Sequence, residues 1–292
     1  MKRLKKQRKL NELPMYKQVP RYVILIAFAL VVLLPIVYTV TNSFMSAAEI
    51  RHYYSSINAE AGSTMFHIVP DRFSLDSYYQ VFLASPNYLR KFWISMGLTT
   101  VIVAGQVVVS CFAGYGFAKF NFPGRDAIFF IIIIMMMMPY QVTLVSNYIV
   151  LDKLNLIGTY WALILPGIFS PFGVFLMRQV MATTPTVLME AAMLDGANQI
   201  QVLFKVVLPR CKSGVVSLII LSFIDNWNMV EQPLIFLDEV SQYPLSVFLA
   251  QANSSNLSLS FTCGILAMLP VALLFLFFEK ELVDGIGFSN LK

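Results

Sequence analysis

The sequence predicts an all-α integral membrane protein with six transmembrane helices. Of its 292 residues, 58% are hydrophobic and only 13% are charged, a composition outside the range of soluble globular domains. The mean hydropathy is +0.70. Several apolar stretches also reach the roughly 20 helical residues that are needed to cross a hydrocarbon core of about 30 Å. Together these observations exclude a soluble fold.

Six stretches meet the length requirement. The first follows a basic head and precedes Ser-Ala-Ala at 46–48, as the core of a secretory signal peptide would. Its apolar core is too long for a signal peptide, so an uncleaved first span is expected. The six spans are expected near residues 22–42, 92–118, 127–149, 159–177, 214–237 and 259–278.

The distribution of lysine and arginine predicts the orientation. If the basic tail, residues 1–21, is cytoplasmic, sixteen of the 21 Lys and Arg residues lie inside, as the positive-inside rule requires. Residues 22–292 then form the transmembrane domain, with both termini in the cytoplasm. The outer loops are expected at about 45–91 and 238–258, and the longest inner loop at about 178–212. Because topology accounts for the net charge of +5, nucleic acid is not an expected partner.

The inner loop contains the polar and small-residue run EAAMLDGANQI, which begins at Glu190. Thr184 and Pro185 are suited to begin a helix before it, because the hydroxyl can cap the helix and proline fits its first turn. Gly196 can end that helix in the left-handed conformation. A first short helix up to about Asp195 is therefore expected.

A second short helix is expected to follow. Asn198 with Gln201 three positions later is typical of a capping box. The spacing i, i+3, i+4, i+7 and i+8 then gives one apolar face, formed by Ile200, Leu203, Phe204, Val207 and Leu208. The loop is thus predicted to be a helix-turn-helix on the inner membrane surface, either packed only on its own membrane domain or docked to another protein.

The fifth span carries acidic and amide residues in its second half. An acidic side chain such as Asp225 or Glu231 near mid-membrane costs about 2.5 to 3.5 kcal/mol on insertion scales. This half must therefore face protein or water. It either lines a solute pathway or belongs to a buried polar cluster that holds helices together.

The inner-loop run resembles the EAA loop of ABC importer permeases in residue type and spacing. The matching residues are Glu190, Ala191, Ala192, Asp195, Gly196 and Ala197, followed by Phe204. The resemblance implies the type I permease fold of ABC importers, with these residues docking on a cytoplasmic ATPase subunit. It also implies a heterodimer with a second permease subunit, two ATPase subunits, an extracytoplasmic solute-binding protein, and location in a bacterial or archaeal inner membrane.

Further segments resemble the carbohydrate, maltose-permease-like branch of these importers. Examples are Gly114 to Ala118, Met138 with Pro139, Trp227 with Asn228, and the tail at Gly285 to Phe288. Met229 stands where the branch usually has an acidic residue, and this departure leaves the exact substrate open.

The resemblance makes a sugar or oligosaccharide the expected cargo. Because pyranose rings have apolar faces ringed by hydroxyls, aromatic and amide side chains are the expected pathway residues. The candidates are Asn226, Trp227 and Asn228 in the fifth span and Tyr140, Gln141 and Asn147 in the third. An importer of amino acids, peptides or polyamines is the first alternative. The second is an intramembrane enzyme with Asp225 and Glu231 as an acid/base pair, which their six-residue separation disfavours.

The chain itself is expected to bind no cofactor and to have no catalytic residues. It lacks the sequence G-x-x-x-x-G-K-[ST], so ATP and Mg²⁺ are expected on the partner ATPase. Its only histidines, His52 and His67, fall in the outer loop without an H-E-x-x-H arrangement, so no metal site is expected.

Overall fold

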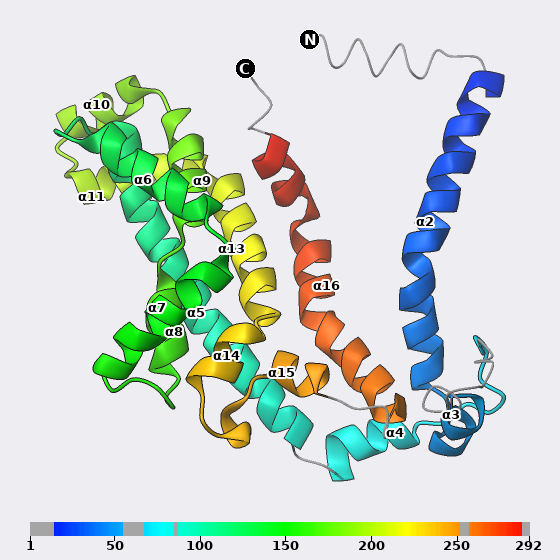
Figure 1. The fold of residues 1–292 in the computed structure, drawn as a ribbon. Coiled ribbons are helices and arrows are strands. Elements are labelled where there is room, and N and C mark those ends of the chain that lie inside the picture. The colour runs from blue at the N-terminus through cyan, green and yellow to red at the C-terminus, as the bar shows by residue number, and fades with distance from the viewer. Residues whose placement is uncertain (1–14, 55–66, 85–86, 252–256, 288–292) are drawn as a thin grey trace. The chain divides into compact units, whose positions relative to one another are not determined.

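The computed structural model describes residues 15–54, 67–84, 87–251 and 257–287, and in these residues every regular element is a helix (Figure 1). The predicted all-α class is therefore confirmed. Most of the basic tail and the end of the chain from residue 288 lie outside the described residues. The chain divides into two compact units, residues 1–84 with 253–265 and residues 85–252 with 266–292.

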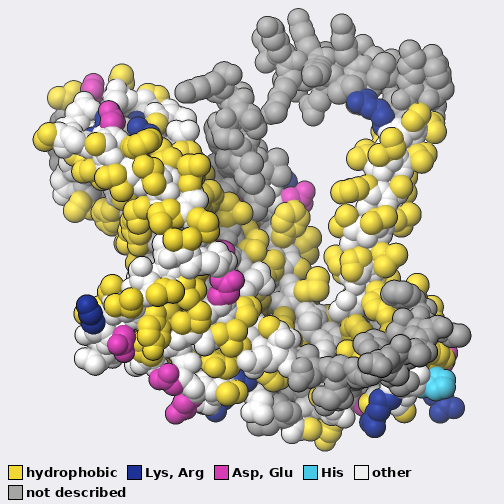
Figure 2. Space-filling view, in the orientation of Figure 1, with side chains coloured by type: hydrophobic (Ala, Val, Ile, Leu, Met, Phe, Trp, Pro, Cys, Tyr) yellow, Lys and Arg dark blue, Asp and Glu magenta, His cyan; other side chains and the backbone are white. Residues whose placement is uncertain are grey.

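The first unit is built around the helix that follows the basic tail. Tyr38 and Phe261 pack against a small core of Met45, Ile50 and Tyr54. The apolar side chains of the first helix are otherwise exposed along its length, as expected for a surface in contact with lipid (Figure 2). Its elements are α2 (Met15–Ser43), α3 (Ala47–Tyr54), α4 (Asp76–Tyr79), η2 (Gln80–Ala84) and the beginning of α16 (Leu257–Gly287).

The second unit has α5 (Asn87–Lys119) at its centre (Figure 1). This helix contacts others of the unit, among them α8, α9, α13 and α15. A Cβ atom added to Gly114 would lie 2.6 Å from Cβ of Met177, so glycine is what allows α5 and α9 to approach so closely. The remaining elements are α6 (Arg125–Met137), α7 (Tyr140–Lys153), α8 (Trp161–Ile168), α9 (Pro171–Ala182), α10 (Thr186–Leu194), α11 (Gln199–Val202), η3 (Leu203–Val207), α12 (Leu208–Arg210), α13 (Lys212–Trp227), α14 (Glu231–Phe236), η4 (Val240–Gln242), α15 (Leu245–Ala250) and the rest of α16.

Four helical segments among the described residues are long and apolar enough to cross a membrane. They are Val19–Ser43, Asn87–Lys119, Trp161–Ala182 and Leu257–Glu281, close to the predicted first, second, fourth and sixth spans. The count rises to six if each of two bent helix pairs is one span. These pairs are Arg125–Met137 with Tyr140–Lys153 and Gln199–Arg210 with Lys212–Trp227.

The third predicted span, 127–149, is not one continuous helix. Its two halves, α6 and α7, are bent by 105° around Met138 and Pro139. Proline disfavours the helical conformation of the residue before it, and Met138 accordingly has an extended ψ of 131°. The bend exposes the start of α7 to a different set of neighbours from those of α6.

The fifth predicted span, 214–237, is also interrupted. Helix α13 ends at Trp227, and α14 begins only at Glu231. At the end of α13 the Ile224 carbonyl accepts two hydrogen bonds from Asn228, one from its backbone N–H at 3.2 Å and one from its side-chain amide at 2.8 Å. The polar half of this stretch is thus a helix end, a short connection and a separate helix.

Candidate functional site

The helices of the predicted inner loop, α10 to α12 at residues 186–210, form two short helices joined by a tight turn, here called the helix pair. Gly196 has a φ of +88°, the left-handed conformation predicted for the end of the first helix. Asn198 Oδ1 accepts from the Gln201 backbone N–H, and Gln201 Oε1 accepts from the Asn198 N–H, both at 2.9 Å. The predicted helix stop and capping box are therefore confirmed.

Two details of the predicted helix pair are wrong. Thr184 does not cap α10, because Pro185 occupies the N-cap position and the Thr184 hydroxyl lies 3.7 Å from Cys211 Sγ. The expected apolar stripe is also divided between two faces. A π-helical turn at Leu203–Val207 places fewer degrees of rotation between residues than an α-helix does. Of the stripe residues, Phe204 within this turn is 53% exposed, and Ile200, which precedes it in α11, is 61% exposed.

One side of the helix pair packs on the helices of the second unit. Lys119 Nζ, at the end of α5, donates to the Thr184 carbonyl at 2.5 Å, and the Tyr115 hydroxyl donates to Gln199 Oε1 at 2.9 Å. The shared apolar core consists of Met189, Val202, Leu203 and Val207 of the pair together with Cys111, Tyr115, Met177, Val180, Met181, Cys211 and Leu218. A displacement of the pair would therefore act directly on α5, α9 and α13.

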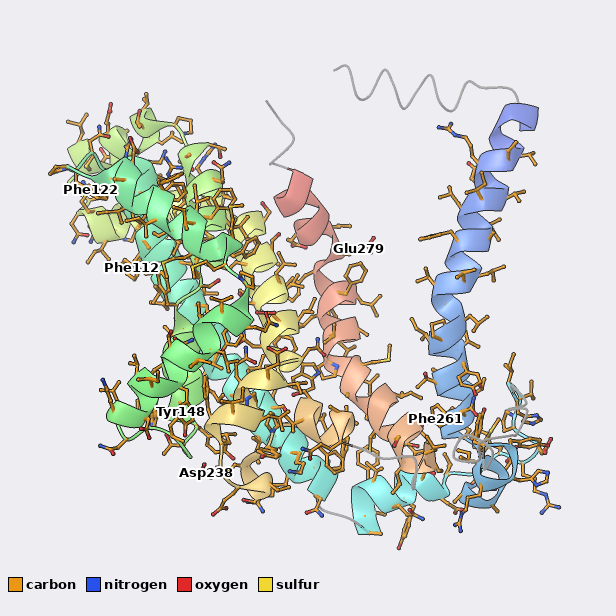
Figure 3. The ribbon with its side chains drawn as sticks, viewed as in Figure 1. Phe112, Phe122, Tyr148, Asp238, Phe261 and Glu279 are labelled. Carbon is orange, nitrogen blue, oxygen red and sulfur yellow. The ribbon has the colours of Figure 1, made fainter. Side chains whose placement is uncertain are left out.

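Other apolar side chains of the helix pair lie outside that core and are exposed. Leu194 is 89% exposed, and Val187 is exposed as well. The ring of Phe204 meets that of Phe112 on α5 edge-on, with 6.1 Å between centroids. Phe112 is labelled in Figure 3. Of the residues that resemble the EAA motif, Glu190, Ala191, Asp195 and Gly196 are exposed, and Ala192 and Ala197 are half-buried.

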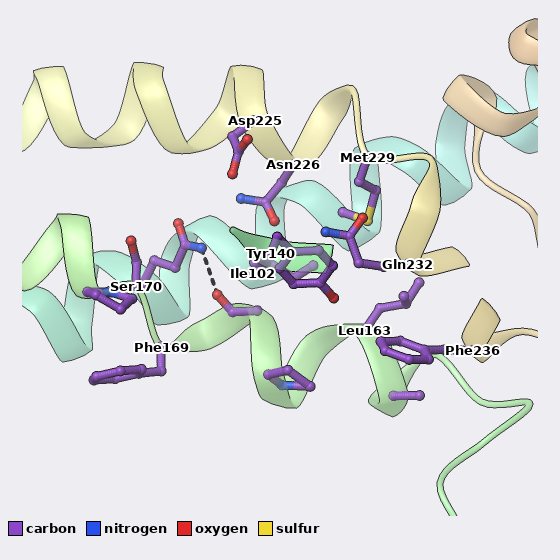
Figure 4. A pocket seen from close by; sticks show the side chains of 15 residues that line it. Ile102, Tyr140, Leu163, Phe169, Ser170, Asp225, Asn226, Met229, Gln232 and Phe236 are labelled. Carbon is purple, nitrogen blue, oxygen red and sulfur yellow. Dashed lines mark hydrogen bonds between the residues drawn. The ribbon is translucent and has the colours of Figure 1, made fainter. Parts of the chain in front are cut away.

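A polar pocket of about 230 Å³ lies among the helices of the same unit (Figure 4). It forms where regular helices end. The break between α8 and α9, the last turn of α13 and the start of α14 all contribute to it. Its lining residues are Ile102, Gln106, Tyr140, Ala162, Leu163, Pro166, Gly167, Phe169, Ser170, Pro171, Asp225, Asn226, Met229, Gln232 and Phe236.

Gln106 is a lining residue that the sequence reasoning missed. Helix α8 ends at Ile168 and Pro171 has no N–H, so the Gly167 carbonyl lacks a helical partner. Gln106 Nε2 donates to this carbonyl at 2.6 Å, the dashed line in Figure 4. Its Oε1 is buried and accepts no hydrogen bond from the described residues. A lone glutamine within the apolar α5 was the available signal, because such residues seek partners inside a membrane.

The structure places two of the six predicted pathway residues in the pocket lining. Tyr140 enters it from the start of α7 and Asn226 from the last turn of α13 (Figure 4). The Asn226 amide also donates to the Ser222 carbonyl at 2.7 Å. Asn147 lies two helical turns further along α7 and hydrogen bonds to Tyr140, so it supports this residue without lining the pocket.

The other three predicted residues lie elsewhere. Gln141 donates to both carboxylate oxygens of Glu231 at 3.2 Å, which joins α7 to α14. Asn228 is exposed and caps the end of α13, as described above. Trp227 is buried, and its Nε1–H donates to the Ala267 carbonyl at 3.1 Å.

The fold, with several helices long and apolar enough to cross a membrane, a packed helix pair and an internal pocket, is that of a multi-pass membrane protein. The family model described as binding-protein-dependent transport system inner membrane component matches residues 106–285. The chain belongs to this family.

Relatives cover most of the chain. The arabinooligosaccharides transport system permease protein AraQ of Bacillus subtilis is 31% identical, over 77% of this chain and 81% of its own. The lactose transport system permease protein LacG of Rhizobium radiobacter is 30% identical, over 70% and 76%. A crystal structure of a bacterial ABC transporter involved in import of the acidic polysaccharide alginate matches with a TM-score of 0.78 and 22% identity, over 91% of this chain and 96% of that one. The predicted resemblance to carbohydrate ABC importer permeases is confirmed.

Proposed function

We propose that this chain is the permease subunit that carries a sugar or oligosaccharide inward across a bacterial inner membrane, driven by ATP hydrolysis on two separate ATPase subunits. The relatives named for arabinooligosaccharides and lactose support the cargo class. Membership of a binding-protein-dependent family supports an extracytoplasmic solute-binding protein as the source of the solute. ATP and Mg²⁺ belong to the ATPase, because this chain has no P-loop sequence.

The proposed topology has six spans with both termini in the cytoplasm. Each bent helix pair then forms one broken span, or one helix of the pair crosses the membrane while the other lies along its surface. The basic residues of the described inner segments support this orientation. They include Lys119, Arg125, Arg178, Lys205, Arg210 and Lys212.

The observation that carries the docking role is the two-sided packing of the helix pair. Its inner side belongs to the core of the second unit, whereas Leu194, Ile200 and Phe204 stay exposed to solvent. A pair that served only its own membrane domain would gain by burying these side chains, since each contributes about 1.5 to 3 kcal/mol when buried. An ATPase subunit that covers them can push on α5, α9 and α13 through the shared core.

The pocket is the proposed part of the sugar pathway that this chain supplies. Its volume of about 230 Å³ is below the 300 to 1,000 Å³ typical of small-molecule sites. The remainder is expected from the second permease subunit. Gln106, Tyr140, Asn226 and Gln232 supply the polar amide and hydroxyl side chains of the lining that could bind sugar hydroxyls.

An intramembrane acid/base enzyme finds no support in this geometry. Asp225 lines the pocket, but Glu231 does not, and its carboxylate accepts from Gln141 instead.

A different solute is the second candidate cargo, because some relatives are named for sn-glycerol-3-phosphate transport. The cargo class can be identified from the ligand that the partner solute-binding protein retains on purification. Mass spectrometry identifies that ligand. A sugar is expected, and an amino acid or peptide would contradict the proposal.

Docking is tested by co-purification of the partner ATPase with the full-length chain. Leu194→Asp changes a side chain that is 89% exposed, so membrane insertion should persist while ATPase recovery falls. The double variant Glu190→Arg with Gly196→Pro should also abolish recovery, because proline cannot adopt the φ of +88° at residue 196. Val240→Asp, an equally non-conservative change at an exposed residue of the outer loop, is the matched control. Full ATPase recovery with both inner-loop variants would refute the docking role.

A further inference from the structure

We propose that Glu49, His67 and Asp71 form a binding site for a divalent transition metal ion, for which Zn²⁺ is the best fit. Glu49 lies on α3, whereas His67 and Asp71 lie on the returning chain, so the ligands come from two segments of the first unit. One ligand atom from each of the three lies within 4.8 Å of the others. Because the ligands are separated in sequence, no metal-binding spacing was visible in the sequence.

The distance between His67 and Asp71 fits a shared ion better than a direct hydrogen bond, and a small shift of Glu49 would complete the site. His67 Nε2 lies 3.4 Å from Asp71 Oδ1 and 4.0 Å from Glu49 Oε1. A charge-assisted N–H to carboxylate bond measures about 2.7 to 2.9 Å, so both separations are too long. Two ligand atoms that each lie about 2.1 Å from a tetrahedral Zn²⁺ are roughly 3.4 Å apart. The Nε2 atom is also buried and has no hydrogen-bond partner among the described residues.

Neighbouring groups hold the three ligands in place. The Tyr53 ring is stacked on the His67 imidazole with 3.9 Å between centroids and 6° between planes. The Tyr53 hydroxyl donates to Asp71 Oδ2 at 2.8 Å, which leaves Oδ1 directed at the histidine. The Asp71 N–H donates to Glu49 Oε1 at 2.6 Å. Such outer contacts, which fix ligand orientation, are characteristic of metal sites.

The backbone of His67 is fixed as well. Its carbonyl accepts from the Tyr54 hydroxyl at 3.2 Å and from Asn42 Nδ2 at 3.5 Å. The ligands therefore need little rearrangement on binding, which favours affinity.

The donor set selects the class of ion. One imidazole nitrogen and two carboxylate oxygens suit Zn²⁺, with water as a fourth ligand, whereas Ca²⁺ requires six to eight oxygens. The bound ion would join α3 to residues 67–71 and stabilise the first unit by mass action, because it binds only the folded arrangement. In the proposed topology this site faces the outside of the cell.

The test is equilibrium dialysis of the purified full-length chain in nanodiscs, first stripped with EDTA and then titrated with Zn²⁺ alone. About one Zn²⁺ per chain is expected, with Ca²⁺ unable to displace it. Glu49→Gln and His67→Gln should abolish stoichiometric binding. Tyr53→Phe keeps the ring and removes only the hydroxyl, and should weaken binding by about 10-fold or more, as outer-contact losses do. His52→Gln, at the other histidine, should leave binding unchanged.

X-ray absorption at the zinc edge separates this site from the three free cysteines, Cys111, Cys211 and Cys263. A shell of nitrogen and oxygen without sulfur supports the proposal. A sulfur shell, equal loss of binding in His52→Gln, or undiminished binding in both Glu49→Gln and His67→Gln would overturn it. Absence of stoichiometric zinc in the wild-type chain would also overturn it. The cluster would then be an electrostatic contact of His67 with Glu49 and Asp71 that binds no metal.

Discussion

Tyr115 of α5 donates its hydroxyl hydrogen to Gln199 Oε1 of α11 across 2.9 Å. Tyr115 is 5% exposed, and it also belongs to the core that α5 shares with the helix pair. A single side chain thus joins a membrane-spanning helix to the inner-loop pair by both packing and a hydrogen bond. In the proposed coupling, this contact would pass a movement of the pair to α5, the helix that carries Gln106.

Tyr115→Phe removes the hydrogen bond and keeps the ring in the core. The free energy of unfolding should fall by about 0.5 to 1.5 kcal/mol. Solute transport in proteoliposomes with the partner subunits should slow while co-purification of the ATPase persists, because the exposed side of the pair is unchanged. Tyr148→Phe removes a hydroxyl from an exposed position of α7 and serves as the control. Equal transport by wild type and Tyr115→Phe would exclude this route.

Gln106→Met replaces the pocket amide by an apolar side chain of similar length. The Gly167 carbonyl loses its partner, and an unsatisfied buried acceptor costs about 1 to 3 kcal/mol. Gln106→Glu keeps an acceptor oxygen but cannot donate to Gly167. Comparison of the two separates the roles. If Oε1 binds the solute, transport by the Glu variant should exceed that by the Met variant at similar thermal stability in detergent, whereas equal transport would assign Gln106 to packing alone.

Trp227→Phe tests whether the tryptophan acts through packing. Its ring is stacked on Phe223 at 5.5 Å and contacts Phe92 edge-on at 5.6 Å, and its Nε1–H donates to Ala267. Phenylalanine retains an aromatic ring but loses the donor, so stability should fall by about 1 kcal/mol or more. The KM for the solute should stay unchanged, because Trp227 does not line the pocket. A KM raised several-fold with unchanged stability would instead indicate that Trp227 binds the solute.

Features set by local chain chemistry were predictable from the sequence. The left-handed Gly196 and the reciprocal bonds of Asn198 and Gln201 depend only on neighbours within one turn, and the structure shows them as predicted. The apolar stripe that follows was not fully predictable. The prediction of this stripe requires a regular α-helical period. The π-helical turn at 203–207 departs from that period, and Phe204 within it is exposed.

The pocket depends on contacts between distant segments, and this limits what the sequence reveals. Tyr140 and Asn226 were chosen for their chemistry and do line it, but Gln141 and Trp227 have the same chemistry and pair elsewhere. Gln106 is separated by 61 residues from the carbonyl it satisfies. A lone glutamine in an apolar stretch indicates that Gln106 needs a polar partner, but the partner could be identified only once the end of α8 was known.

Gly114→Ala should disrupt the contact between α5 and α9. The new methyl group would lie 2.6 Å from Met177 Cβ and 2.9 Å from the Arg178 backbone nitrogen, and backbone atoms cannot move aside cheaply. Overpacking of this kind costs about 1 to 3 kcal/mol. The matched control is Gly116→Ala in the same helix, where nothing lies within 4 Å of the added atom, so its stability should be unchanged or rise by up to about 1 kcal/mol. Thermal unfolding in detergent measures both, and equal melting temperatures for the two variants would show that α5 and α9 do not meet closely at Gly114.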